Sequence, residues 1–309
     1  MSKGTFVERQ KELFSSFEKG DLNEALALIQ QTKTEFPERL EKIRFWEACA
    51  FSTLGKEQEA VATLQEGIKE GIWWNPYILT ADSDLQNLQT HDGFKKIVEQ
   101  CEEIFRTQKE NATCELFVYG NRHSEIGILC IHARGTNVKD SAPYWLQDKG
   151  EQSYLFGFPQ SSQVFGYQAY CWDDQEIALK EVEQAHKEFH EISRIKSKII
   201  GGASQGGKLA IELSLSKALP GIKGFIAVMP AIKNVAAIEA LLKENDYSDL
   251  KGYIIIGDQD PFYQNTLDLI AILKANKIDC QLIVKEGLGH FFPDDFPNML
   301  SEAVAYIVP

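Results

Sequence analysis

Lys198-Ile-Ile-Gly-Gly-Ala-Ser-Gln-Gly-Gly-Lys-Leu-Ala-Ile211 is the stretch that decides the fold. It places a G-x-S-x-G motif between an apolar run typical of a strand and an amphipathic run typical of a helix, the context of a nucleophile elbow. Such a turn is so tight that Ser204 must adopt a strained backbone and that side chains at Gly202 and Gly206 would clash. A Gly-rich turn that binds phosphate is the alternative. We expect the Ser204 hydroxyl to stand above the edge of a sheet.

A serine hydroxyl needs a base, and the base needs an orienting acid. Of the six histidines, only His290, in Gly287-Leu-Gly-His290, lies on a loop after the last strand-like run and C-terminal to a candidate acid. The acid lies in Gly257-Asp-Gln-Asp260-Pro, where Asp258 and Asp260 compete. Asp260 is favoured because it lies further out and directly before a proline, whereas Asp258 is expected to hydrogen-bond within its turn. The sequence therefore predicts Ser204, Asp260 and His290 as catalytic residues.

From about residue 111 onward, apolar runs alternate with amphipathic runs. Continuous apolar runs are typical of parallel strands buried on both faces. The alternation predicts an α/β fold, a doubly wound, mostly parallel sheet with helices on both faces. The expected strands are 115–119, 127–132, 153–158, 198–202, 224–229, 252–256 and 280–284, and the expected helices are 174–195, 206–218, 234–244, 262–276 and 295–307.

Residues 1–110 have a different composition, rich in Glu, Lys, Gln, Leu and Ala, and are expected to be helical throughout. The block 20–30 aligns with the block 55–65, with Gly, Glu, both Ala and Gln identical. Each block begins with a glycine, as a helix–helix turn requires, and places alanines where two helices approach closely. The segment resembles tetratricopeptide repeats over residues 5–72. We therefore expect a helical-repeat domain, residues 1–110, followed by the α/β domain, residues 111–309.

The motifs of residues 115–309 together resemble the phospholipase/carboxylesterase branch of the α/β-hydrolases, which includes acyl-protein thioesterases. The residues that carry the resemblance are the elbow Gly-Ala-Ser204-Gln-Gly-Gly, the acid in Gly-Asp-Gln-Asp260-Pro, the base in Gly-Leu-Gly-His290, and two stretches before the elbow, 158–162 and 171–174. The resemblance implies the same triad of Ser204, Asp260 and His290. It departs from the family at His132-Ala133, where the family has His-Gly.

An oxyanion hole requires two backbone amides aimed at the developing charge. The elbow places the amide of Gln205 at a helix N-terminus, where negative charge is favoured. The second donor normally follows an early strand, a place that 128–136 occupies here, and the resemblance implies the amide of Arg134. The Arg134 side chain is expected either to bind an acidic group of the substrate or to point to solvent.

Charge, apolar runs and cysteine spacing argue against several other classes of protein function and location. The formal charge of -13 disfavours nucleic acid as a partner and anionic membrane surfaces as a binding site. No run is long and apolar enough for a membrane span and no secretory signal is found, and the six cysteines lack CxxC spacing, so a cytoplasmic protein with reduced thiols is expected. His186 and His190 lie at a helical spacing that can bind metal, but a solvated face is favoured, and no metal or cofactor is expected.

The sequence thus predicts a serine hydrolase of esters or thioesters, acting on a small-molecule or acyl-protein ester. A peptidase or lactone hydrolase on the same fold is one alternative. The other is a protein-binding scaffold with vestigial activity, because helical repeats commonly bind protein partners.

Overall fold

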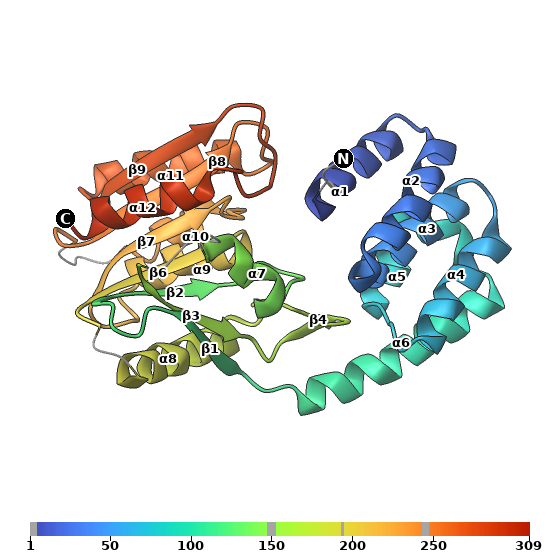
Figure 1. Ribbon diagram of the computed structural model, residues 1–309, viewed down its shortest axis with the longest axis horizontal. Helices are drawn as coiled ribbons and strands as arrows, with labels where there is room; N and C mark the ends of the chain where they lie inside the picture. Colours follow the sequence, from blue (N-terminus) through green and yellow to red (C-terminus); the bar gives the residue numbers. More distant parts are fainter. Residues whose placement is uncertain (1–4, 147–152, 193–194, 243–246) are drawn as a thin grey trace. The chain divides into compact units, whose positions relative to one another are not determined.

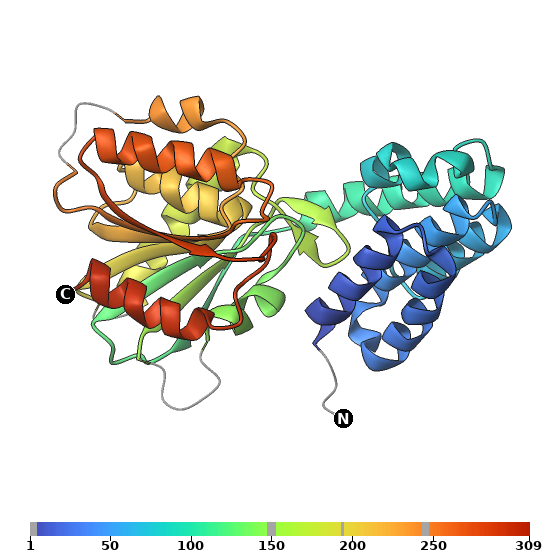
Figure 2. The same ribbon diagram turned by 90° about the horizontal axis from the view of Figure 1, so that it is seen from above.

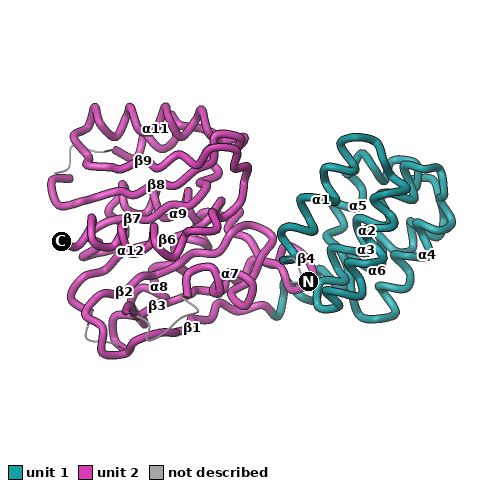
Figure 3. The backbone as a smooth tube through the Cα atoms, turned by 45° about the horizontal axis from the view of Figure 1, so that its top comes forward, with its two compact units in different colours: residues 1–111 teal, residues 112–309 magenta. Residues whose placement is uncertain are grey.

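The computed structural model describes residues 5–146, 153–192, 195–242 and 247–309. The chain divides into two compact units, Met1–Asn111 and Ala112–Pro309 (Figure 3). The first unit is all-helical and the second is built on a sheet. This division into an all-helical region followed by an α/β region confirms the predicted fold class.

The first unit is a succession of helices (Figure 1). In chain order these are α1 (Phe6–Glu18), α2 (Leu22–Glu35), the short 3-10 helix Pro37–Arg39, α3 (Leu40–Thr53), α4 (Glu57–Lys69), α5 (Pro76–Ala81), the 3-10 helix Ser83–Leu88 and α6 (Asp92–Asn111). Pro37 lies just past the end of α2, where its ring prevents the helix from continuing.

The two aligned blocks of the sequence form equivalent turns and helices. Gly20 and Gly55 have φ of 75° and 72°, the left-handed conformation in which a glycine avoids the steric cost of a Cβ. Ala25 in α2 and Ala60 in α4 are fully buried, so the small residues lie where neighbouring helices pack. The local pattern of the repeat therefore has a structural counterpart in both blocks.

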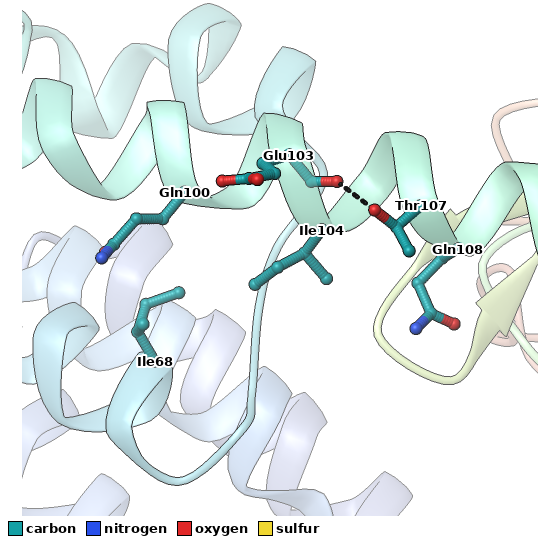
Figure 4. A pocket seen from close by; sticks show the side chains of 6 residues that line it. All are labelled: Ile68, Gln100, Glu103, Ile104, Thr107 and Gln108. Atoms are coloured by element: carbon teal, nitrogen blue, oxygen red, sulfur yellow. Dashed lines mark hydrogen bonds between the residues drawn. The ribbon is translucent and has the colours of Figure 1, made fainter.

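Trp73 and Trp74 anchor this helical unit. Both are buried, and the indole Nε1 of Trp74 donates to the Glu41 carbonyl at 2.7 Å. A Cβ on Gly67 would lie 2.4 Å from the Trp74 ring, which explains why α4 carries no side chain there. A surface groove of about 410 Å³ runs between α4 and α6; Figure 4 shows the side chains that line it, Ile68, Gln100, Glu103, Ile104, Thr107 and Gln108.

The second unit is built on a seven-stranded sheet in the order β1-β3-β2-β6-β7-β8-β9. The strands are β1 (Glu115–Gly120), β2 (Ile126–Ile131), β3 (Leu155–Gln160), β6 (Ser197–Ala203), β7 (Ile222–Val228), β8 (Lys251–Gly257) and β9 (Asp279–Lys285). All pairs are parallel except the antiparallel pair of β1 and β3. These are the seven strands that the sequence predicts, each within a few residues of its expected ends.

Helices cover both faces of the sheet (Figure 2). One buried core joins the sheet to α8 (Gln175–Ile192), α9 (Gln205–Leu215), α10 (Val235–Glu239) and α11 (Tyr263–Ala275); the other joins it to α7 (Val138–Trp145) and α12 (Phe296–Ile307). Along β2, Ile128 and Cys130 face the second core while Leu129 and Ile131 face the first. This alternation explains why the strand is a continuous apolar run.

Three elements escaped the sequence prediction. They are α7, which carries Pro143 inside the helix, and the short strands β4 (Val164–Gly166) and β5 (Ala169–Tyr170), which form a separate pair. The helix expected at 234–244 is shorter, Val235–Glu239, and residues 243–244 of that prediction lie outside the described residues.

Two further sequence expectations concern membranes and thiols. Among the described residues, no helix combines the length and hydropathy that crossing a bilayer requires. All six cysteines are described and none forms a disulfide.

Candidate active site

Ser204 lies between β6 and α9 with a strained backbone, φ 53° and ψ −115°. Three hydrogen bonds hold it there: its N–H donates to the Val228 carbonyl at 2.9 Å, and its carbonyl accepts from Lys208 at 3.0 Å and from Ala231 at 3.0 Å. The end of β7 and the segment after it therefore fix the turn. This is the strain that the elbow motif predicts, and surrounding structure must over-determine it for it to persist.

The glycines on either side of Ser204 cannot be replaced without movement of the backbone. A Cβ on Gly202 would lie 2.2 Å from the Gly206 carbonyl oxygen. A Cβ on Gly206 would lie 2.2 Å from the carbonyl oxygen of Ile131 and 2.6 Å from that of His132. The first turn of α9 is thus packed directly on the loop after β2, which brings Gln205 close to that loop.

His290 forms hydrogen bonds to both Asp260 and Ser204. Its Nδ1 lies 2.7 Å from Asp260 Oδ2, and its Nε2 lies 2.9 Å from Ser204 Oγ. Because an ionised carboxylate only accepts, Nδ1 carries the proton and Nε2 is left to accept from the serine hydroxyl. The structure thus brings together the three predicted side chains from three separate loops. In space, the base His290 lies between the nucleophile Ser204 and the acid Asp260.

Asp260 and Asp258 have different partners. The Asp260 side chain is fully buried, and its Oδ1 accepts from the Phe262 N–H at 2.8 Å. Asp258 Oδ1 accepts from the Gly287 N–H at 2.8 Å, and within the described residues Asp258 forms no hydrogen bond to His290. The sequence argument for Asp260 therefore agrees with the geometry, and Asp258 connects the loop after β8 to the loop after β9.

Gly257 brings those two loops into direct contact. A Cβ there would lie 1.8 Å from the Leu288 carbonyl oxygen, and Gln259 N–H donates to the same carbonyl at 3.0 Å. The loop that carries Asp260 and the loop that carries His290 are therefore fixed against each other, which explains the glycine before Asp258.

The loop after β2 is stabilised by His132, which is buried. Its Nε2 accepts from the Ser161 N–H at 3.3 Å, so its Nδ1 carries the proton and donates to the Ala133 carbonyl at 2.8 Å. Burial lowers the pKa of His132 to about 4, and the ring is neutral at pH 7. His132 is therefore a structural residue of this loop.

Ala133 departs from the family's glycine without strain. Ala133 is not among the described non-glycine residues that have positive φ. Gly135, two positions later, has φ 75°. A Cβ at Ala133 is therefore compatible with this loop, and the left-handed residue of the turn is Gly135.

The Arg134 side chain is 50% exposed, as expected of a side chain that points to solvent, and it also forms an ion pair. Its Nε and Nη2 donate to Asp173, at 2.9 Å to Oδ1 and 2.7 Å to Oδ2. Its guanidinium also lies 4.3 Å from the centre of the Phe165 ring. Asp173 thus engages the Nε and Nη2 donors of Arg134 in a bidentate pair.

Two tryptophans near the site, Trp145 and Trp172, are buried. Trp172 donates from Nε1 to the His132 carbonyl at 3.0 Å, and Trp145 packs edge-on against Phe296 at 5.1 Å. Tyr144 is partly exposed and stacks on Phe292 at 4.4 Å. Trp172 and Trp145 therefore serve packing.

His186 and His190 do not share a solvated face, which corrects the reading of their spacing. His186 is buried and burial lowers its pKa to about 4, while His190 is exposed. No group of metal ligands within the described ranges includes either histidine.

The chain is similar to a known domain family in its helical unit and to several solved structures. Residues 6–111 match the family model of the A/B hydrolase-like, N-terminal domain, which agrees with the α/β-hydrolase resemblance. No curated protein matches the sequence at a significant level.

Among solved structures, an uncharacterized protein from Bacillus cereus ATCC 10987 is similar over 99% of both chains, with 27% identity and a TM-score of 0.55. A phospholipase/carboxylesterase from Dyadobacter fermentans DSM 18053 matches 63% of this chain and 97% of its own, with 17% identity and a TM-score of 0.48. Zea mays acyl-protein thioesterase 2 matches 63% of this chain and 99% of its own, with 13% identity and a TM-score of 0.49.

Proposed function

We propose that this protein is a serine hydrolase that cleaves carboxylic ester or thioester bonds through a covalent acyl-enzyme. The observation that carries the proposal is the pair of hydrogen bonds at His290, 2.9 Å to Ser204 Oγ and 2.7 Å to Asp260 Oδ2. These distances are within proton-transfer reach, and the third group orients the base, as nucleophilic catalysis by serine requires.

Acylation begins when Ser204 Oγ attacks the carbonyl carbon of the substrate and its proton passes to His290 Nε2. Asp260, ionised and hydrogen-bonded to Nδ1, stabilises the imidazolium that results. The carbonyl oxygen becomes an oxyanion, which accepts hydrogen bonds from the amides of Gln205 and Arg134. The tetrahedral intermediate then collapses, and the leaving alcohol or thiol takes the proton from Nε2.

Deacylation repeats these steps with water. His290 Nε2 accepts a proton from the water as its oxygen attacks the acyl carbon. The second tetrahedral intermediate expels Ser204 Oγ, which takes the proton back, and the carboxylic acid is released. No cofactor or metal is needed for either half-reaction.

The resemblance to carboxylesterases and acyl-protein thioesterases favours an ester or thioester over an amide. A peptidase or lactone hydrolase would use the same three residues, so only the substrate separates these activities. A panel of p-nitrophenyl esters, acyl thioesters, lactones and peptide amides at equal concentration distinguishes them, and the largest kcat/KM is expected for an ester or thioester.

The experiment that tests the proposal is replacement of Ser204 by Ala. Turnover of p-nitrophenyl acetate should fall by at least about 1000-fold, because removing one triad member leaves only residual catalysis. Ser216→Ala, at the opposite end of α9, is the matched control and should retain wild-type turnover. Turnover by Ser204→Ala equal to that of the control would refute the proposal, and failure of a fluorophosphonate to label Ser204 would favour the scaffold alternative.

A further inference from the structure

One carboxylate joins the side chains of Arg134 and Gln205, the two residues whose amides are proposed to bind the oxyanion. Asp173, in the loop between β5 and α8, accepts from Arg134 Nε at 2.9 Å and from Arg134 Nη2 at 2.7 Å. The same carboxylate accepts from Gln205 Nε2 at 2.8 Å. Arg134 follows β2 and Gln205 begins α9, so Asp173 connects two otherwise separate elements.

The residue before Asp173 extends this network. The main-chain N–H of Trp172 donates to Gln205 Oε1 at 2.9 Å, so both ends of the Gln205 amide group are bonded to one loop. The Trp172 indole donates to the His132 carbonyl at 3.0 Å, which fixes the start of the loop that carries Arg134. Segment 172–173 is therefore bonded to the side chains of Arg134 and Gln205, the two proposed donors, and to the carbonyl of His132, which begins the loop that carries Arg134.

Main-chain contacts also hold the two backbone amides: the Gly135 N–H, next to Arg134, donates to the Tyr170 carbonyl at 2.8 Å, and the first turn of α9 packs on the Ile131 carbonyl. Gln205 is the first residue of α9, and an N–H in the first turn of a helix has no acceptor inside the helix. Arg134 lies in a turn, and its N–H has no backbone acceptor in the part of the chain that the structure describes. Such unpaired amides are what an oxyanion requires, and the side chains of both residues are bonded to segment 172–173.

We propose that Asp173 is a positioning residue that aligns the amides of Arg134 and Gln205 for the oxyanion. This inference rests on the proposed function. The hydrogen bond from Arg134, together with that from Gln205, lowers the pKa of Asp173 below its ordinary value, so the carboxylate is charged at neutral pH.

The role of Asp173 concerns geometry more than folding stability. The Arg134 and Asp173 side chains are 50% and 44% exposed, and exposed ion pairs stabilise proteins little. By contrast, a small displacement of a catalytic group can lower the rate by about 100-fold. The loss of Asp173 should therefore affect turnover much more than the melting temperature.

The test is Asp173→Asn, with Asp174→Asn as the matched control. Asp174 is adjacent in the same loop, but its Oδ1 accepts from the N–H groups of Glu176 and Ile177 at the start of α8, and asparagine can replace it there. Asp173→Asn should lower kcat for p-nitrophenyl acetate by about 10- to 100-fold with KM within about threefold of the wild type, a fraction of the effect of deleting a donor. Asp174→Asn should retain the wild-type values.

A second readout separates positioning from general disturbance. A trifluoromethyl ketone forms a tetrahedral oxyanion adduct on the serine, so its inhibition constant should rise in Asp173→Asn by about the same factor as kcat/KM falls. Binding of the product carboxylic acid, which forms no oxyanion, should stay unchanged. Values for Asp173→Asn equal to those of Asp174→Asn in both assays would overturn the inference.

Gln205→Met keeps the test decisive if Asp173→Asn does not fold. This variant retains the backbone N–H but loses both side-chain bonds to segment 172–173, and the same split between kcat and KM is expected. Unchanged kcat in Gln205→Met would overturn the inference even though Ser204→Ala is inactive, whereas a wild type without turnover would overturn the proposed function and this inference with it.

Discussion

The two units of the chain differ in which residue types adopt positive φ, a backbone conformation that is unfavourable for residues other than glycine. In the helical unit the described residues with positive φ are glycines, Gly20, Gly55 and Gly71. The described part of the second unit adds five non-glycine residues, Gln168, Ser204, Lys217, Met229 and Lys277. Positive φ in a non-glycine residue costs on the order of 1–3 kcal/mol. Lys217 and Lys277 directly follow the C-terminal caps of α9 and α11, where left-handed residues commonly end helices.

Two of these five residues are neighbours at the carboxyl edge of the sheet. Ser204 N–H bonds to the Val228 carbonyl, and Met229, which follows directly, has φ 41° and bonds from its N–H to the Ile255 carbonyl at 2.7 Å. In the helical unit, glycines adopt the positive φ of the turns at little cost in free energy. At the sheet edge, Ser204 and Met229 adopt positive φ although they carry side chains. The chemistry is therefore expected at the sheet edge and not in the helical unit.

The largest effect should come from the orienting acid. Asp260→Asn should lower kcat by about 10,000-fold, because an amide at this position favours the wrong imidazole tautomer of His290. The matched control is Asp258→Asn, two residues earlier, which should keep kcat within about tenfold since Asp258 contacts the Gly287 N–H and not the imidazole. Steady-state kinetics of purified variants measures both, and equal losses would contradict the assignment of Asp260.

The next largest effect is expected from replacing a glycine by alanine, and a glycine of each unit is compared. Gly206→Ala should lower kcat/KM by about 100- to 1000-fold, because its Cβ would lie 2.2 Å from the Ile131 carbonyl oxygen and the first turn of α9 must move. The readout is kcat/KM for p-nitrophenyl acetate together with a melting temperature for each variant.

Gly55→Ala is the counterpart in the helical unit. No atom lies within 4 Å of its added Cβ, so only the left-handed backbone opposes it, at about 1–2 kcal/mol. Its kcat/KM should equal that of the wild type. Equal loss of activity in the two variants would show that the proposed contrast between the units is wrong.

The smallest effect concerns pH and stability. His132 has its pKa lowered from 6.5 to about 4 by burial, so the unfolded chain binds a proton at higher pH than the folded chain does. Stability should therefore fall as pH decreases from about 6.5 toward 4, by up to about 3 kcal/mol from this residue. Urea unfolding at several pH values measures it.

His132→Asn should reduce that dependence on pH, although a lower stability at pH 7 is also expected because its bonds to Ser161 and Ala133 are altered. The exposed His123→Asn serves as the control and should keep the wild-type slope. A slope that is the same in all three proteins would contradict the assignment of His132 as a buried neutral group.

The parts of the molecule that follow from local pattern were predictable from the sequence. The seven sheet strands are apolar runs bounded by turns, and the elbow is a contiguous motif whose glycines have a steric reason. Asp260 followed from its place directly before Pro261, and His290 from chain order.

The parts that depend on distant contacts were not predictable. The ion pair of Arg134 and Asp173 joins residues 39 positions apart, and neither carries a local signal for the other. Segment 171–174 enters the sequence analysis only through a family resemblance, which gives Asp173 no partner. Likewise, α7 escaped because Pro143 lowers helix propensity, which the packing of Trp145 and Ala142 offsets.

The most direct measurement of the central claim is the site of covalent labelling by a fluorophosphonate, determined by peptide mass spectrometry on the full chain. One adduct is expected, on Ser204, because His290 Nε2 lies 2.9 Å from its hydroxyl and can act as its base. An unlabelled Ser204, or an adduct on another residue, would contradict it.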